Sequence, residues 1–302
     1  MTTWSLPRIK LEPNGLTITN LSFNDRKYDF HTYTPEANLA NKNLQVYSTF
    51  SPQSRTRLRR AFNLLIATST VQTGYNFTSQ RSFSFLLNFI TLTLSAKQGI
   101  YTDYDIKKLL LNDFLTRLRQ QKKLTSYIWR AEPQKNSNIH FHITTNQWFD
   151  WQFIRDTWNN TQKKLGYIDL FNEKHHHINP NSTDIHSVHD IKHTGKYISK
   201  YLSKVATDSR SLNGKIWDCS QNLQPKDKCE IICQGSDFDF LCKLESTFED
   251  RTYRTDFFKF IPLTQVEIKE YLPNRWLKQY ENYLQSVDKN YFLKKNDINS
   301  NV

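Results

Sequence analysis

The stretch Asn138-Ile139-His140-Phe141-His142-Ile143-Thr144 decides the fold. Its polar and apolar residues alternate, and β-branched and aromatic side chains dominate, which predicts a β-strand. Because side chains alternate between the two faces of a strand, His140 and His142 share one face while the apolar residues face a core. Two imidazoles on one face can bind one metal ion. A His-x-His pair can also simply line the polar face of a half-buried strand.

A second predicted strand, Tyr127–Glu132, lies immediately upstream, and the turn-forming residues 134–138 separate the two. In an antiparallel hairpin centred on Asn136, Glu132 lies opposite His140. Directly opposed residues share a face, with Cβ atoms ~5 Å apart. This register would give a Glu/His/His metal site with open positions. The alternative is that Glu132 is a solvated charge at the end of a strand.

A third motif is the tandem Tyr-x-x-Lys unit in Gly195–Lys204. On a helix, Tyr197 and Tyr201 are four residues apart and lie on one face. Each is followed three residues later by a lysine, Lys200 and Lys204. Tyrosines at helical spacing often serve packing, but here apolar partners are few and the lysines recur in phase with the tyrosines.

Together these motifs resemble the HUH endonucleases, specifically the rolling-circle replication initiators, over roughly Ser84 to Ala206. Phe89–Leu94 resembles the first motif, the innermost strand. His140-Phe141-His142 resembles the metal-binding motif, and Glu132 is at a position similar to the third ligand of virus-encoded members. The doubled tyrosine is similar to the gene A replication proteins of isometric single-stranded DNA phages and related bacterial elements. A departure from the family is the run of histidines before the tyrosines: His175, His176, His177, His186, His189 and His193.

The resemblance implies an enzyme that nicks and religates single-stranded DNA at an origin hairpin. Tyr197 and Tyr201 would be the nucleophiles, and the product would be a 5′-phosphotyrosine and a free 3′-hydroxyl. Lys200 and Lys204 would stabilise the phenolate or the phosphate. Either both tyrosines react in turn, or one reacts and its neighbour packs or contacts DNA.

The implied cofactor is a divalent metal, Mg²⁺ or Mn²⁺, held by His140, His142 and Glu132. The chain has no G-x-x-x-x-G-K-[ST] motif, so we expect a host or partner helicase to unwind the DNA and a polymerase to extend it. The same chemistry would serve a transposase or a plasmid relaxase. A further alternative is a non-catalytic nucleic-acid-binding protein.

The composition favours a polyanionic partner, because 302 residues carry a net charge of +12 and 14% are aromatic. A helix is predicted from about Pro52, and its first half carries Arg55, Arg57, Arg59 and Arg60. These four arginines and Arg130 are the predicted DNA-binding residues; a solvated basic helix face is the alternative. We expect no membrane segment and a cytoplasmic location in a bacterial host, since no apolar run is long enough to span a bilayer.

The order of predicted elements is β-α-β-β-α-β, the ferredoxin-like split arrangement of an α+β fold. We expect a long buried strand over Ser84–Ser95, a helix capped by Asp103, and a helix from Asp150 that stops at Gly166. A polar loop, Phe171–Ser182, and a strand, Thr183–Val188, then lead into the tyrosine helix. This order predicts an antiparallel sheet with helices on one face and the metal ligands on the other.

We expect five segments along the chain: an N-terminal extension (1–50), a basic helical segment (51–83), the HUH endonuclease core (84–210), a C-terminal extension packed on the core (211–288) and a mobile tail (289–302). The four cysteines, Cys219, Cys229, Cys233 and Cys242, form no Cys-x-x-Cys pair, which favours reduced thiols over a structural zinc site.

Overall fold

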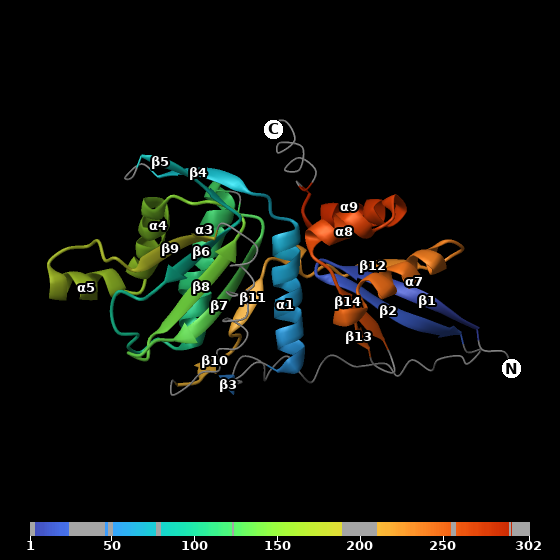
Figure 1. Ribbon diagram of the computed structural model, residues 1–302. Helices are drawn as coiled ribbons and strands as arrows, with labels where there is room; N and C mark the ends of the chain where they lie inside the picture. The colour runs from blue at the N-terminus through green and yellow to red at the C-terminus, as the bar shows by residue number, and fades with distance from the viewer. Residues whose placement is uncertain are drawn as a thin grey trace. The chain divides into compact units, whose positions relative to one another are not determined.

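The computed structural model describes residues 4–23, 46–47, 51–76, 80–122, 124–188, 210–254, 258–289 and 291. They form two compact units, one from Thr34–Gln224 and the other from Met1–Tyr33 with Pro225–Val302. In the structure, the basic helix therefore belongs to the same unit as the predicted endonuclease core, and the N-terminal strands belong with the C-terminal segment. Figure 1 shows the elements of both units.

The larger unit is built on a five-stranded sheet with the order β11-β7-β8-β6-β9. Every neighbouring pair in it is antiparallel. Its strands are β6 (Leu87–Leu92), β7 (Tyr127–Pro133), β8 (Ile139–Thr145), β9 (Thr183–Val188) and β11 (Trp217–Cys219). With helices between β6 and β7 and between β8 and β9, the chain follows the β-α-β-β-α-β order. The α+β class with an antiparallel sheet is confirmed.

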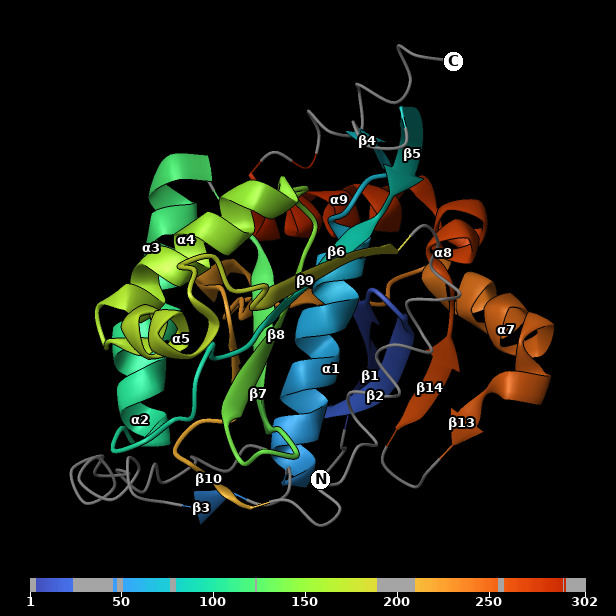
Figure 2. The ribbon, with the colours of Figure 1, turned by 90° about the vertical axis from the view of Figure 1, so that its left-hand side faces the viewer.

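Helices lie on both sides of this sheet (Figure 2). They are α1 (Pro52–Ala67), α2 (Asp103–Asp105), α3 (Asn112–Lys122), α4 (Trp151–Lys163) and α5 (Tyr167–His175), with a π-helix at Ile106–Leu111 and a 3₁₀ turn at Gln221–Leu223. The core lies between the sheet and α3–α4, where Trp158 is fully buried and meets Phe114 and Phe141 edge-on. On the other face, α1 packs against β7 through Leu58 and Phe62.

Among the described residues, the larger unit also contains two small strand pairs. β3 (Val46–Tyr47) pairs with β10 (Leu212–Asn213). β4 (Gln72–Asn76) pairs with β5 (Arg81–Phe85), which leads into β6. The expected long strand over Ser84–Ser95 is therefore wrong in its bounds. The chain bends at Leu86, and only Leu87–Leu92 joins the main sheet.

The smaller unit is a second antiparallel sheet with the order β12-β1-β2-β14-β13. Its elements are β1 (Trp4–Glu12), β2 (Gly15–Phe23), β12 (Cys229–Ile232), β13 (Tyr253–Arg254), β14 (Lys259–Pro262), α7 (Asp237–Thr247), α8 (Gln265–Tyr271) and α9 (Asn274–Val287), with a 3₁₀ turn at Glu249–Arg251. Ile9, Leu11, Leu16 and Ile18 of the first two strands are buried, and so is Trp276 of α9.

Two expectations about helix ends need correction. The polar loop was expected to begin at Phe171, but Phe171 lies inside α5. Gly166, with φ of 75°, separates α4 from α5, and α5 begins at Tyr167. Asp103 does not cap the helix that follows. Thr102 does, in a capping box with Asp105.

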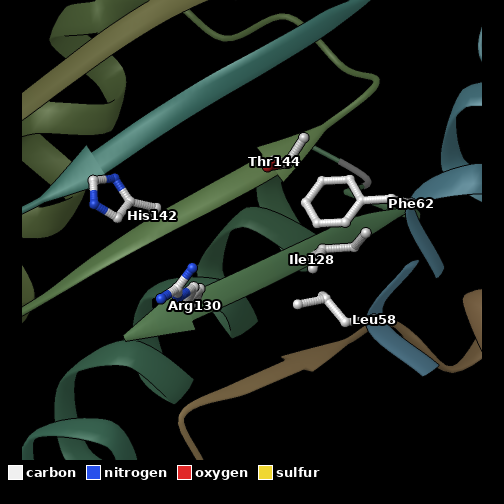
Figure 3. Close-up of a pocket in the computed structure, with 6 residues that line it drawn as sticks. All are labelled: Leu58, Phe62, Ile128, Arg130, His142 and Thr144. Atoms are coloured by element: carbon white, nitrogen blue, oxygen red, sulfur yellow. The ribbon is translucent and has the colours of Figure 1, made fainter. Parts of the chain in front are cut away.

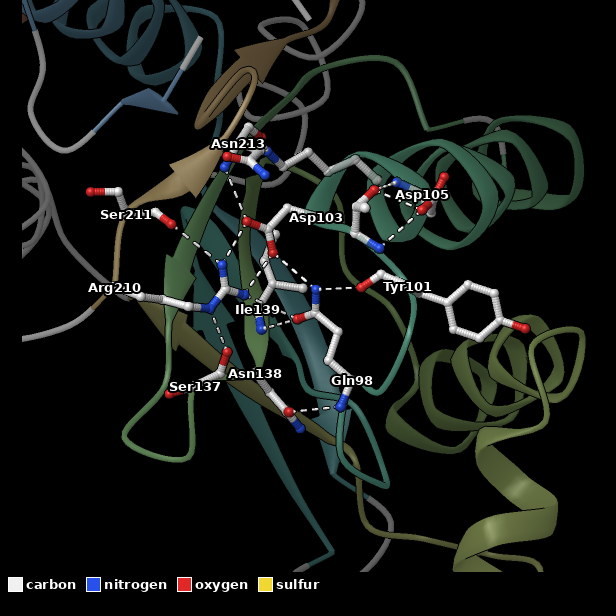
Figure 4. Close-up of polar contacts among 12 residues, drawn as sticks. Gln98, Tyr101, Asp103, Asp105, Ser137, Asn138, Ile139, Arg210, Ser211 and Asn213 are labelled. Carbon is white, nitrogen blue, oxygen red and sulfur yellow. Dashed lines mark hydrogen bonds and ion pairs between the residues drawn. The ribbon is translucent and has the colours of Figure 1, made fainter. Parts of the chain in front are cut away.

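Asp103 instead lies at the centre of a buried polar cluster (Figure 4). The Arg210 guanidinium donates to both of its carboxylate oxygens at 2.6 and 2.7 Å, and Gln98 and the Asn213 N–H donate to it as well. Burial by itself raises the pKa of Asp103, but these hydrogen bonds and the Arg210 charge outweigh it and hold that pKa below its ordinary value. The carboxylate is therefore ionised and stabilised by folding.

No helix among the described residues is both long and apolar enough to cross a bilayer. Cys219, Cys229 and Cys233 are buried and Cys242 is exposed, and all four thiols are free. Burial raises the pKa of the Cys219, Cys229 and Cys233 thiols to about 11.

Replacing Asp103 by Asn should lower the free energy of unfolding by about 2 kcal/mol at pH 7, because Arg210 loses its charged partner. The folded-state pKa lies below the ordinary value of 3.8, so the stabilisation is complete above that value and disappears as the pH falls through the folded-state pKa. Urea unfolding at pH 7 and at about pH 3 measures both effects. Asp156→Asn, at an exposed carboxylate on α4, is the matched control; an equal loss in both variants would contradict the prediction.

Candidate metal centre

The β7–β8 hairpin has the register that the sequence predicts. Glu132 lies opposite His140, and Arg130 lies opposite His142. Ile139, Phe141 and Ile143 are fully buried on the other face. Because the apolar residues of β8 fill the core under α3 and α4, its two histidines are turned to the opposite face of the sheet.

Three donor atoms converge on that face. Glu132 Oε2 lies 3.9 Å from His140 Nε2 and 3.7 Å from His142 Nε2, and the two Nε2 atoms are 2.9 Å apart. Ligand atoms on one ion are separated by about 3 to 4 Å, because metal–ligand bonds are roughly 2.0–2.2 Å long. The side chains are only 7%, 12% and 22% exposed for Glu132, His140 and His142. This largely buried group could bind a metal ion.

Thr91 of β6 supports the site from the neighbouring strand. It lies opposite His142, and its Oγ1 is 3.2 Å from His142 Nδ1. When Nδ1–H donates to this hydroxyl, the Nε2 lone pair is left for a metal ion. The role of Thr91 could not be predicted from the sequence, because its position beside His142 depends on the β6–β8 register, which no local pattern reveals.

Arg130 is buried beside the donor group, and its Nε lies 3.2 Å from Glu132 Oε1. One carboxylate oxygen of Glu132 thus faces a guanidinium while the other faces the two imidazoles. Arg130 and His142 also line a small pocket whose other walls are Leu58 and Phe62 of α1 and Ile128 and Thr144 of the sheet (Figure 3). The basic helix therefore covers the face of the sheet next to the candidate site.

Edge strand β9 continues the same face. Asp184 lies opposite Thr91 and His186 opposite Phe89. His186 Nε2 and Asp184 Oδ2 are 2.7 Å apart, and both side chains are about 60% exposed. The histidines 175–177 are exposed at and just beyond the end of α5.

The predicted nucleophile motif, Tyr197, Lys200, Tyr201 and Lys204, falls within residues 189–209, outside the described residues, as do His189 and His193. This stretch connects the end of β9 to Arg210 of the polar cluster. The predicted DNA-binding arginines of α1 lie in the part of the chain that the structure describes. Arg55, Arg57 and Arg59 are exposed, and Arg60 is partly buried.

Comparison with known proteins supports a replication role for this part of the chain. Residues 88–206 match the sequence model of a family described as replication-associated protein ORF2. The matched stretch runs from β6 through Glu132, His140 and His142 to the tandem Tyr-x-x-Lys unit. Neither the curated proteins nor the solved structures that were searched gave a match. The family match supports a rolling-circle replication initiator.

Proposed function

We propose that this protein is a two-tyrosine HUH endonuclease that starts rolling-circle replication by nicking single-stranded DNA at an origin hairpin. The observation that carries the proposal is the convergence of Glu132, His140 and His142 on one face of an antiparallel sheet. The family match and the tandem tyrosines, which follow β9 in the sequence, support it.

The phenol oxygen of Tyr197 or Tyr201 attacks the scissile phosphorus and forms a new phosphorus–oxygen bond. The bond to the 3′-oxygen breaks, so the 5′ end stays on the tyrosine and the 3′-hydroxyl is released. The phosphodiester energy is conserved in the phosphotyrosine, so the step is reversible and requires no ATP. A free phenol has a pKa of ~10 and must lose its proton to react, and Lys200 and Lys204 would stabilise the resulting negative charge.

The donor group of the sheet suits Mg²⁺ or Mn²⁺. Because two of its three donors are imidazoles, it should bind Mn²⁺ more tightly than Mg²⁺. When bound, such an ion polarises the scissile phosphate. Arg130 holds Glu132 in place through its 3.2 Å ion pair, and Thr91 orients the ring of His142. A second tyrosine on the same motif would allow the regenerated junction to be cut without releasing the first 5′ end.

The exposed Arg55, Arg57 and Arg59 of α1 would contact the phosphate backbone beside the site. A helicase of the host or a partner would then displace the nicked strand, and a polymerase would extend the 3′-hydroxyl.

A covalent adduct tests the chemistry. With Mn²⁺ and labelled single strands from the origin of its own replicon, the wild type should retain only the DNA 3′ of the cut, as seen on a denaturing gel. Tyr197→Phe and Tyr201→Phe should each retain adduct if both tyrosines react, and the double variant should form none. Tyr104→Phe, at an exposed tyrosine of α2, is the matched control. DNA binding without any adduct or cleavage would contradict the nickase and favour a binding protein.

Metal affinity tests the donor group independently of activity. Glu132→Gln should weaken Mn²⁺ binding more than about 100-fold in calorimetry, because a ligand charge is lost. Thr91→Val should weaken it about 10-fold, because His142 loses the partner that orients it. Thr183→Val is the matched control. Thr183 of β9 lies opposite the core residue Leu92, so this variant removes a hydroxyl from the face of the sheet away from the donor group and should leave the Mn²⁺ affinity unchanged. Wild-type affinity in Glu132→Gln would remove Glu132 from the ligand set.

A further inference from the structure

The proposed reaction leaves one proton to be accounted for. A phenol is protonated at neutral pH, because its ordinary pKa is ~10, and it must lose that proton to attack a phosphorus atom. Side chains that hold a metal ion do so in their deprotonated form and accept no proton while the ion is bound. A lysine ammonium group donates hydrogen bonds and accepts none. The reaction therefore requires a proton acceptor other than the donor group and the lysines of the Tyr-x-x-Lys unit.

Edge strand β9 carries the remaining titratable side chains of this part of the sheet. In β6, β8 and β9 the titratable residues are His140, His142, Asp184 and His186. Asp184 and His186 are two residues apart on one strand, so they share a face. Asp184 lies opposite Thr91, and Thr91 lies opposite His142. The carboxylate and the imidazole of β9 are therefore on the face of the sheet that carries the candidate metal centre.

The two side chains of β9 are joined to each other. His186 Nε2 lies 2.7 Å from Asp184 Oδ2, which is the length of a charge-assisted hydrogen bond. When Nε2–H donates to the carboxylate, the Nδ1 atom of His186 presents its lone pair. A carboxylate that orients an imidazole in this way prepares the ring to take a proton from a hydroxyl group.

The exposure of the pair favours a chemical role over a structural one. The side chains of His186 and Asp184 are 60% and 59% exposed. Exposed ion pairs contribute little to stability, because water screens the charges and two side chains lose their freedom. The buried pair of Asp103 and Arg210 is the structural counterpart in the same unit, where the aspartate side chain is only 1% exposed. An exposed imidazole can be reached by a phenol and can pass its proton on to water.

The distance from the donor group also suits a base. Neighbouring strands are ~4.8 Å apart, so β9 lies ~10 Å from β8 along the row that contains His142, Thr91 and Asp184. A metal–phosphate contact, an attack distance of ~3.3 Å and a hydrogen bond of ~2.8 Å together span up to roughly 10 Å. A base for a phenol that attacks a phosphate at the donor group is therefore needed near β9. In the sequence, Tyr197 follows His186 by eleven residues.

We propose that His186 is the general base of the nicking reaction and that Asp184 is its positioning residue; this rests on the proposed function. As the tyrosine oxygen forms its bond to phosphorus, the phenol proton passes to Nδ1 of His186. The bond from phosphorus to the 3′-oxygen breaks, and this oxygen takes a proton from water. In religation the 3′-hydroxyl loses its proton to water as it attacks, and the His186 imidazolium returns a proton to the departing tyrosine oxygen.

Chemical rescue tests this role in the full-length chain, with Mn²⁺ and a labelled single strand that contains the nick site. His186→Ala should lower the maximal rate of adduct formation about 100-fold and leave the DNA affinity unchanged. Free imidazole should restore much of that rate, because the position is open to solvent, and should not accelerate the wild type. Asp184→Asn should lower the rate about 10-fold. His175→Ala, at an exposed histidine of α5, is the matched control and should equal the wild type with and without imidazole.

A second readout separates a base from a metal ligand or a structural residue. Calorimetry should give His186→Ala the Mn²⁺ affinity of the wild type, and its thermal midpoint should be unchanged. A loss of Mn²⁺ affinity would assign His186 to the metal ligands, and a rate loss that imidazole does not restore would also contradict the base. If the wild type forms adduct and His186→Ala matches its rate, the base proposal alone is wrong. If the wild type forms no adduct, the proposed function is wrong and the base with it.

Discussion

The pairing of Glu132 with His140 across the β7–β8 hairpin is the constraint on which the candidate site depends. If the pairing of β7 with β8 were shifted by one residue, Glu132 would lie on the core face of the sheet, and the two histidines would lie on the opposite face. The five-residue turn fixes this register. Gln134 N–H donates to the Asn138 carbonyl, and Ser137 adopts a positive φ of 67°. The Asn138 side chain, which is buried, donates to the Ala96 carbonyl and accepts from Gln98 N–H, so the turn is held against the loop that follows β6.

The same turn is joined to the stretch that follows the tyrosines. Arg210 donates to the Ser137 carbonyl and to Gln98 Oε1, in addition to its two bonds with Asp103. Gln98 Oε1 in turn accepts from the N–H of Ile139, the first residue of β8. One connected set of hydrogen bonds therefore reaches from the start of β8 to the first described residue after the tandem Tyr-x-x-Lys unit. The helix start at Thr102, the hairpin turn and Arg210 are thus fixed relative to one another.

The sequence predicted those features that local pattern determines. The alternation in β8 and the composition of the turn were enough to predict Glu132 beside His140 and His142, and the helix expected from Asp150 is α4. Asp103 shows where such reasoning fails. It has the side chain of a helix cap, but its partner is Arg210, 107 residues later, and Thr102 takes the cap. Thr91 was missed for the same reason, since its contact with His142 spans 51 residues.

The electrostatics of the site favour a cation at its centre. A buried carboxylate is costly unless a positive charge or several donors face it. Arg130 faces Oε1 of Glu132, but Oε2 faces the two imidazole Nε2 atoms, which in neutral rings oriented as ligands present lone pairs. The two Nε2 atoms, 2.9 Å apart, share a hydrogen bond when one ring carries its proton there, and when both are deprotonated at Nε2 their lone pairs and Glu132 Oε2 converge within 4.8 Å, where a cation would offset their repulsion. The hairpin register therefore determines both the pairing of the two strands and the group of side chains that could bind a metal ion.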